Sequence, residues 1–183
     1  MKARFIIALM AFAYFATTVS AYCAPTWHQA FDEMCLRLSA ECAPYNDSDP
    51  SFVKMTPKLM TQLVAVNIVV NHAITYTSDQ EHNGQLDYWD YPADGKGDCE
   101  DYALEKRRRL VEMGWPRRAM RMAIVSLKDI DMLHAVMLIN TNKGILVLDM
   151  NVNDIRDVSK IYLLDHIVAI QSANDPRHWI EAK

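Results

Sequence analysis

The sequence predicts a single α+β domain in which helices come first and strands follow. Apolar residues in the first half of the chain recur every three to four positions, as on one face of a helix. After residue 119 they alternate with polar residues instead, as in a strand. The chain has 183 residues, 51% of them hydrophobic, and neither a repeat nor a linker-like segment divides it. Helices followed by strands, without strict alternation, are typical of the α+β class.

Two helices are expected in the first half of the chain. The first covers residues 27–38, where apolar side chains repeat at helical spacing, and a loop rich in Pro, Asn and Ser follows it. The second covers residues 58–74, because Thr56 and Pro57 make a favourable N-cap and first-turn pair before an apolar helical face. That face is expected to be buried.

A third helix is expected over residues 98–113, after a polar segment over 78–97 that is rich in turn residues. Gly114 and Pro116 end this helix, since Gly is favoured just after a helix and Pro cannot continue one. The third helix is therefore bounded on both sides by local signals.

Strands are expected in the last part of the chain. Two apolar runs, 133–139 and 145–148, flank the segment 140–144, which contains Asn and Gly and is typical of a β-hairpin turn. The apolar run within 161–170 predicts a further strand. The sheet is therefore expected to contain at least one antiparallel pair.

Composition excludes nucleic acid as a partner. The chain has 19 Lys and Arg against 23 Asp and Glu, which gives a formal net charge of −4. Its one cationic run, residues 106–109, is too short to form a basic surface.

The first 21 residues predict a secretory signal peptide. Lys2 and Arg4 are positively charged, an uncharged apolar run follows over residues 5–15, and small residues precede Ala21. The run is shorter than the ~20 residues that span a bilayer, so an uncleaved membrane anchor is the weaker interpretation. We therefore expect a mature domain over residues 22–183 that is periplasmic or secreted.

Export changes the interpretation of the four cysteines, because disulfides form in oxidising compartments. Cys35 and Cys42 are close in sequence and are expected to form a disulfide; the alternative is a pair of buried thiols. Cys23 has no evident partner. Cys99 would have to remain unpaired in order to act as a thiol.

Cys99 is the candidate nucleophile, because its surroundings place it at the first position of a helix. Asp98 has the character of an N-cap residue, and Asp101 completes an arrangement like a capping box. Unpaired backbone N–H groups and the helix dipole at that position favour a thiolate and can stabilise an oxyanion. Gly97 is expected to let a substrate backbone approach closely.

The carboxylates around Cys99 oppose ionisation of the thiol, because negative charge raises the pKa of a thiol. Either Asp98, Glu100 and Asp101 point away from the sulfur as helix caps, or a cation neutralises them. The alternative without function is a well-capped helix that begins with a small buried thiol. These residues alone do not decide between a reactive cysteine and a purely structural one.

His134 and Asp149 are the candidate partners of the thiol. A cysteine nucleophile needs an imidazole, and the imidazole needs an acceptor that orients it. A tight loop centred between Thr141 and Asn142 would pair residues whose numbers sum to 283, which puts His134 directly opposite Asp149. Each residue by itself is more often structural, but the joint pattern predicts a Cys-His-Asp triad.

The chain resembles the bacterial transglutaminase-like cysteine proteinases over most of the mature domain. The most specific part is the block GDCEDYA over residues 97–103, and the segment 27–42 resembles the cysteine-containing start of small members. The other matching residues are Val66-Asn67, Val70-Asn71, Ile74-Thr75-Tyr76, Asp87-Tyr88-Trp89, Lys106, Gly114-Trp115-Pro116, His134-Ala135-Val136 and Leu148-Asp149.

The resemblance implies a papain-like fold, with a nucleophile helix packed on an antiparallel sheet. It implies that Cys99, His134 and Asp149 hydrolyse peptide bonds without a cofactor in the chemistry itself. The branch similar to LapG-type periplasmic proteases cuts surface adhesins and binds calcium through acids beside the cysteine, which would place calcium near Asp98 and Glu100.

The partners implied by the resemblance are a protein or peptide substrate, with a surface adhesin as one candidate, and an inner-membrane regulator. Met150 follows Asp149 where relatives often carry Asn, so the triad transfers more safely than the substrate. Transfer or hydrolysis of amides in cell-wall peptides and a non-catalytic partner-binding module remain alternatives.

Overall fold

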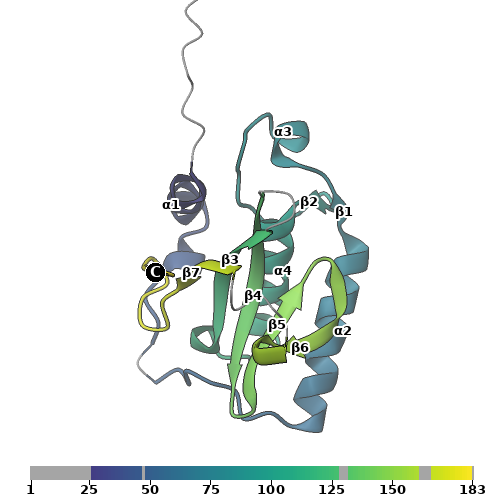
Figure 1. Cartoon of the computed structure of the whole chain (residues 1–183), viewed down its shortest axis with the longest axis vertical. Coiled ribbons are helices and arrows are strands. Elements are labelled where there is room, and N and C mark those ends of the chain that lie inside the picture. The colour runs from purple at the N-terminus through teal and green to yellow at the C-terminus, as the bar shows by residue number, and fades with distance from the viewer. Residues whose placement is uncertain (1–25, 47, 128–131, 161–165, 183) are drawn as a thin grey trace, which may run out of the picture.

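The computed structural model describes residues 26–46, 48–127, 132–160 and 166–182 (Figure 1), and the expected signal peptide and Cys23 lie outside these ranges. The helices are α1 (Trp27–Arg37), α2 (Pro57–Ala73), α3 (Asp79–His82) and α4 (Cys99–Glu112), with the short 3-10 helices η1 (Ser39–Cys42), η2 (Arg117–Ala119) and η3 (Val158–Lys160). The strands are β1 (Thr75–Tyr76), β2 (Lys96–Gly97), β3 (Met120–Leu127), β4 (Met132–Thr141), β5 (Gly144–Asp149), β6 (Val152–Asp157), β7 (Ile167–Gln171) and β8 (Trp179–Glu181). The α+β class is confirmed.

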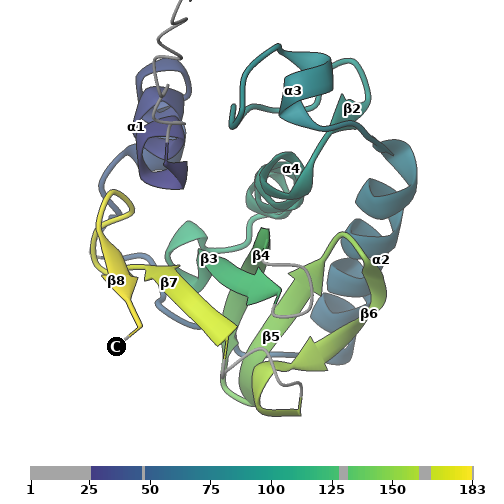
Figure 2. The same cartoon turned by 45° about the horizontal axis from the view of Figure 1, so that its top comes forward.

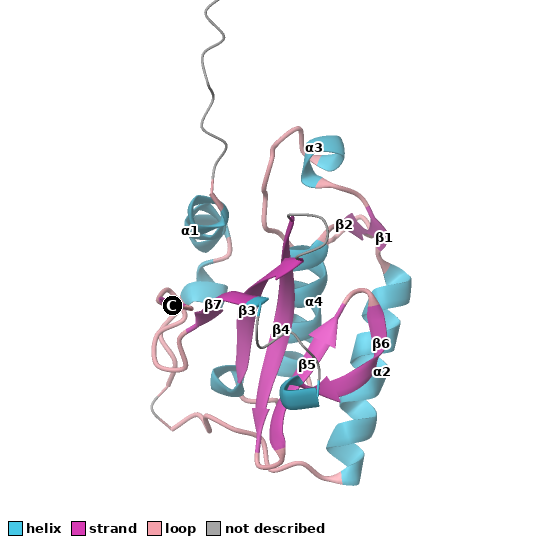
Figure 3. Ribbon diagram, in the orientation of Figure 1, coloured by secondary structure: helices cyan, strands magenta, loops and turns pink. Residues whose placement is uncertain are grey.

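Six strands form an antiparallel sheet in the order β6-β5-β4-β3-β7-β8, while β1 and β2 form a separate parallel pair. Figure 3 shows the larger sheet as a continuous magenta layer with the helices at its sides. The strands from β3 to β6 follow one another directly along the chain, and short connections of this kind produce antiparallel pairing.

The helix α4 packs against one face of the sheet, and α2 lies beside α4 and β6 (Figure 2). The main core lies between these helices and the sheet. The inward-facing sheet residues of this core include Met120, Met122, Ile124, Ala135, Met137, Ile139, Leu146 and Leu148. Alternate residues of the same strands form a smaller cluster on the other face with Val158 of η3; the strand residues are Ala123, Val125, Val136, Leu138 and Val147.

Local signals define the ends of the long helices. Thr56 is the N-cap of α2, and its hydroxyl oxygen accepts a hydrogen bond from Leu59 N–H at 3.2 Å. Pro57 occupies the first helical position, where its missing N–H costs nothing. Gly114 follows the C-cap of α4 with a φ of 87°, in the left-handed region that favours Gly. These predictions from the sequence are confirmed.

The hairpin of β4 and β5 is present, but its register differs from the predicted one. Thr141 pairs with Gly144, so the numbers of paired residues sum to 285 and not to 283. Gly144 has a φ of 119°, which allows a tight turn through 142–143. Asp149 therefore does not lie directly opposite His134. Because the shift is two residues and side chains alternate with a period of two, both side chains keep the same face of the sheet.

Several elements were not expected from the sequence. The strand β6 is mostly polar and half exposed, so it lacks the alternating apolar pattern of a typical strand. The helix α3 and the strand β8 are too short to produce a periodic signal. The strand expected within 161–170 is observed from Ile167, and residues 161–165 lie outside the described ranges. In the described part of the chain, no helix is long and apolar enough to cross a membrane.

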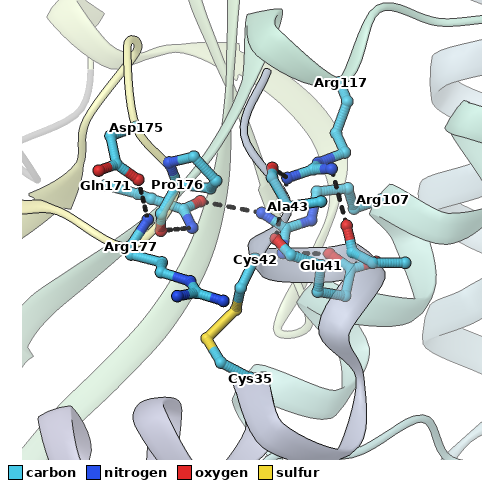
Figure 4. Close-up of a disulfide and its surroundings, with 11 residues drawn as sticks. Cys35, Glu41, Cys42, Ala43, Arg107, Arg117, Gln171, Asp175, Pro176 and Arg177 are labelled. Carbon is cyan, nitrogen blue, oxygen red and sulfur yellow. Dashed lines mark hydrogen bonds and ion pairs between the residues drawn. A yellow bond between two sulfur atoms is a disulfide. The ribbon is translucent and has the colours of Figure 1, made fainter. Parts of the chain in front are cut away.

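A disulfide joins Cys35 of α1 to Cys42 of η1, with Cα atoms 5.4 Å apart. Figure 4 shows it beside the ion pair of Glu41 and Arg107, a fully buried residue of α4. Arg107 also donates a hydrogen bond to Gln171 Oε1 of β7 at 2.9 Å. The disulfide-bonded loop is therefore attached to both α4 and the sheet.

Candidate active site

Cys99 is the first residue of α4, as the sequence predicts. Asp98 is the N-cap residue, and Asp101 Oδ2 accepts a hydrogen bond from Asp98 N–H at 3.2 Å. The Cys99 Sγ accepts a hydrogen bond from the backbone N–H of Ala135 at 3.3 Å, which places the sulfur beside β4. Of the cysteines in the described ranges, Cys99 is the one with a free thiol.

Gly97 has a structural role that differs from the expected one. A Cβ atom at this buried position would lie 2.4 Å from Asp101 Oδ2. Asp101 Oδ1 also accepts a hydrogen bond from Asp90 N–H at 2.8 Å, so the Asp101 side chain is held in place. Gly is needed here because this carboxylate packs against it. The expected approach of a substrate backbone stays a prediction.

His134 and Asp149 are in direct contact, with Nε2 and Oδ1 2.9 Å apart. His134 lies near the start of β4 and is only 6% exposed, and Asp149 is the last residue of β5. Although burial opposes the shift, the hydrogen bond and charge of His134 lower the pKa of Asp149. An ionised carboxylate only accepts hydrogen bonds, so Nε2 is the ring nitrogen that donates to Asp149.

Cys99 and His134 line the same cavity, which has a volume of about 580 Å³. Its rim includes four exposed apolar side chains, those of Tyr76, Leu86, Met132 and Leu133. No hydrogen bond links Cys99 to His134 among those of the described residues. The thiol instead donates to Glu100 Oε2, at a distance of 3.1 Å between sulfur and oxygen.

The thiol of Cys99 is therefore held in its protonated form. Burial raises the pKa of Cys99 well above its usual value, and the negative charges of Glu100 and Asp98 raise it further. The hydrogen bond from Ala135 N–H acts in the opposite direction. Burial and the neighbouring acids thus act against the preference of a helix N-terminus for a thiolate, and Glu100 does not point away from the sulfur.

Five acidic side chains converge beside the thiol. The carboxylate oxygens of Asp79, Asp87 and Glu100 lie within 4.8 Å of one another, as do those of Asp79, Asp98 and Asp101. Burial raises the pKa of Asp87 to about 7 and that of Asp101 to about 8. Burial and the charge of Asp98 raise the pKa of Glu100 well above its usual value.

This acid cluster fits a hard divalent cation. Calcium takes six to eight oxygen ligands, most often from carboxylates and carbonyls. Asp98 Oδ1 is buried without a hydrogen-bond partner in the described structure, so it has a free position for a ligand. The sequence indicated Asp98 and Glu100 but not Asp79 and Asp87, because no spacing signal in the segment before α4 links these residues to the cysteine.

Three further polar residues lie around Asp149, and the sequence assigned no role to them. Lys106 of α4 is 1% exposed, and its charge interacts with that of Asp149. Asn67 and Asn71 of α2 donate hydrogen bonds to the backbone around Asp149 and Val152. Two signals were available: all three residues belong to the segments that carry the family resemblance, and the four-residue spacing of the asparagines places them on one helical face.

A helix that begins with a cysteine packs on an antiparallel sheet, and the sheet brings a histidine held by an aspartate to the cavity that the cysteine lines. This arrangement defines a transglutaminase-like cysteine peptidase. The sequence agrees with the geometry. The chain belongs to the family of bacterial transglutaminase-like cysteine proteinases, whose family model matches residues 19–183.

Solved structures of Legionella pneumophila LapG are similar to this protein. One is 30% identical with a TM-score of 0.53, and the match covers 66% of each chain. The EGTA-treated form is 29% identical with a TM-score of 0.56, covering 71% of this chain and 70% of that one. The calcium-bound form is 27% identical with a TM-score of 0.55, covering 71% of this chain and 75% of that one. A comparison with curated proteins found no match.

Proposed function

We propose that this protein hydrolyses peptide bonds through a triad of Cys99, His134 and Asp149. The observation that carries the proposal is the 2.9 Å contact of His134 Nε2 with Asp149 Oδ1, beside a cavity that Cys99 also lines. Membership of a cysteine proteinase family supports the same reaction class. In this proposal Cys99 is the nucleophile, His134 the general base and Asp149 the acceptor that orients the imidazole.

The proposed reaction is acyl transfer to water. His134 Nδ1 takes the proton of the thiol, and the thiolate attacks the carbonyl carbon of the peptide bond. The backbone N–H of Cys99, at the start of α4, stabilises the oxyanion. The imidazolium then protonates the leaving amine. Water that has lost a proton to His134 hydrolyses the thioester, which releases the new carboxylate and restores the thiol.

We further propose that this activity depends on calcium held by Asp98 and Glu100, with Asp79 and Asp87 as additional ligands. The Cys99 thiol donates to Glu100, so this carboxylate competes with His134 for the same proton. Bound calcium supplies positive charge that offsets the acids beside the sulfur. A Glu100 side chain engaged with a cation leaves the thiol free to turn to His134. The calcium-bound LapG structure supports this proposal.

We propose that the protein acts in the periplasm or outside the cell. The signal-like residues 1–21 and the disulfide between Cys35 and Cys42 both support export. The proposed substrate is a cell-surface or periplasmic protein, with a surface adhesin as one candidate. An inner-membrane regulator is the proposed second partner.

Replacement Cys99→Ala is expected to abolish proteolysis and leave the fold intact, because it removes the nucleophile but little volume. The measurement is a mass-spectrometric comparison of new protein N-termini in the exported fraction of cells that carry the wild-type chain or the variant. Cys23→Ala, which removes a different cysteine, should retain every cleavage. Cleavage that persists in Cys99→Ala would exclude the proposal, and a labelled primary amine incorporated into the product would favour amide transfer.

Calcium is expected to raise the melting temperature of the protein, because a ligand that binds only the folded state stabilises it. At a calcium concentration one hundred times the Kd, the gain is about 2.7 kcal/mol. Asp98→Asn and Glu100→Gln should weaken calcium binding in a calorimetric titration. Asp32→Asn, at an exposed acid of α1, is the matched control. Equal binding by all four proteins would contradict the assignment of the ligands.

A further inference from the structure

Asp149 is the last residue before the tight turn that joins β5 to β6. Asp149 Oδ1 accepts a hydrogen bond from Asn151 N–H at 2.9 Å, in addition to its contact with His134. Asp149 also pairs with Val152 across the turn. The orientation of the carboxylate is therefore set by the conformation of this turn.

The ladder between β5 and β6 is irregular next to the turn. Val147 pairs with Arg156 and Asp149 with Val152, so one residue of β5 stands opposite three residues of β6, numbers 153–155. Bulges of this kind are frequent beside active sites, where they re-aim a side chain. They also leave backbone carbonyl groups without a partner in the ladder, and such groups must be satisfied from elsewhere.

Two asparagines of α2 supply the missing donors. Asn71 Nδ2 donates to the backbone oxygen of Asp149 at 3.0 Å and to Asn153 Oδ1 at 3.1 Å. Asn67 Nδ2 donates to the backbone oxygens of Val152 at 2.8 Å and Asn153 at 3.0 Å. The two amides thus contact both sides of the turn from one face of a helix outside the sheet.

We propose that Asn67 and Asn71 are positioning residues, which hold the β5–β6 turn so that Asp149 stays in hydrogen-bond contact with His134. This inference rests on the proposed function, in which Asp149 orients the imidazole. We call the two side chains the amide clamp.

The side chains of the amide clamp act as hydrogen-bond donors and do not serve only to fill space between the helix and the sheet. Asn67 is fully buried, and the Oδ1 atoms of Asn67 and Asn71 are buried without a hydrogen-bond partner in the described structure. Burial of an unpaired polar atom is costly, so a residue chosen for packing alone would be apolar at these positions. Each amide uses its NH₂ group as a donor, and the acceptors are backbone oxygens around Asp149 and, for Asn71, also Asn153 Oδ1.

The test is a spectroscopic signature of the contact between His134 and Asp149. A ring N–H that donates to a carboxylate gives a proton resonance far downfield, which can be detected in the full chain labelled with ¹⁵N-histidine. Asp149→Asn assigns the signal of His134. We expect Asn71→Ala and Asn71→Leu to weaken this signal or to shift it, both variants in the same direction. Asn67→Ala tests the second residue of the amide clamp. Val69→Ala, at an exposed position of α2, should leave the signal unchanged.

A second readout follows the reactivity of Cys99 with iodoacetamide at fixed pH and with calcium present. Loss of the clamp is expected to slow alkylation about 10- to 100-fold, the range for a catalytic group displaced by about 1 Å. Circular dichroism selects variants that retain the fold, and Asn71→Leu keeps the buried volume if Asn71→Ala does not fold.

The outcomes separate the clamp from the triad. An unchanged His134 signal in folded Asn71→Ala and Asn71→Leu would overturn the amide clamp. A lost signal together with slowed alkylation supports it. The signal could also be lost in the Asn71 variants and in Asp149→Asn while alkylation and proteolysis stay unchanged. That result would support the amide clamp as what holds the turn, and it would overturn the proposed role of Asp149.

Discussion

Lys106 lies seven residues after Cys99 on α4, which places the two side chains on the same helical face two turns apart. Burial lowers the pKa of Lys106 to about 7, although the negative charge of Asp149 opposes this shift. The charge of Lys106 in turn helps to lower the pKa of Asp149, after the larger effects of burial and of His134. A single buried lysine thus couples the nucleophile helix to the acid of the proposed triad.

Lys106→Met is expected to remove a pH-dependent part of the free energy of unfolding. The unfolded chain keeps this proton up to a pH of about 10.5, whereas the folded protein releases it near 7. The unfolded state therefore binds more protons between these values, and the stability of the wild type rises with pH across that window. Below that window Lys106 is protonated in both the folded and the unfolded state, so its contribution to the free energy of unfolding does not change with pH.

Relative to the wild type, Lys106→Met should therefore be most stable near pH 7 and lose this advantage as the pH rises. Urea unfolding at pH 7 and pH 9 measures the difference. Lys58→Met, at an exposed position of α2, is the control for the loss of a lysine. A difference for Lys106→Met that does not change with pH would contradict the assigned pKa.

At the scale of elements, α4 is joined to its neighbours through charged side chains that it buries. Arg107 pairs with Glu41 of η1. Burial acts to raise the pKa of Glu41, but the Arg107 charge, a hydrogen bond from Tyr91 and the Arg117 charge together lower it. Arg108 and Arg109 both donate to Glu105 within the helix. The cationic run over residues 106–109 is therefore engaged in contacts within the protein.

Removal of the disulfide by Cys35→Ala with Cys42→Ala is expected to lower the free energy of unfolding by about 2 to 3 kcal/mol, the entropic cost of a short loop. The effect should extend to the ion pair of Arg107, because Glu41 directly precedes Cys42. Urea denaturation measures the loss. Leu36→Ala, at an 86% exposed residue inside the same loop, is the matched control. A double variant as stable as this control would contradict the prediction.

At the scale of the whole molecule, the predictions that held depend on neighbours along the chain. The first residue of α4 follows from Asp98 and Asp101, and the β4–β5 hairpin follows from two apolar runs around a turn. The contact of His134 with Asp149 survived an incorrect register, because an even shift leaves both side chains on one face. Periodicity therefore predicted the faces of the strands more reliably than their pairing.

The features that the sequence did not predict depend on segments far apart in the chain. Asp79 and Asp87 reach the acid cluster because the loop before α4 folds back onto the start of that helix. Asn67 and Asn71 meet the β5–β6 turn only because α2 packs beside β6. The spacing of the asparagines places them on one helical face, but no pattern in the sequence indicates which distant segment either set of residues contacts.

The sequence by itself determined, to within one residue, where the three long helices begin and end. It also determined which strand faces are apolar and that a cysteine starts the helix at the site. These properties depend on capping, turn chemistry and periodicity within a few residues. Only the tertiary structure decided that the Cys99 thiol donates to Glu100 and that two helices hold the surroundings of Asp149. The physical reason is that burial and close approach, which set the charge and orientation of these groups, arise when distant segments pack together.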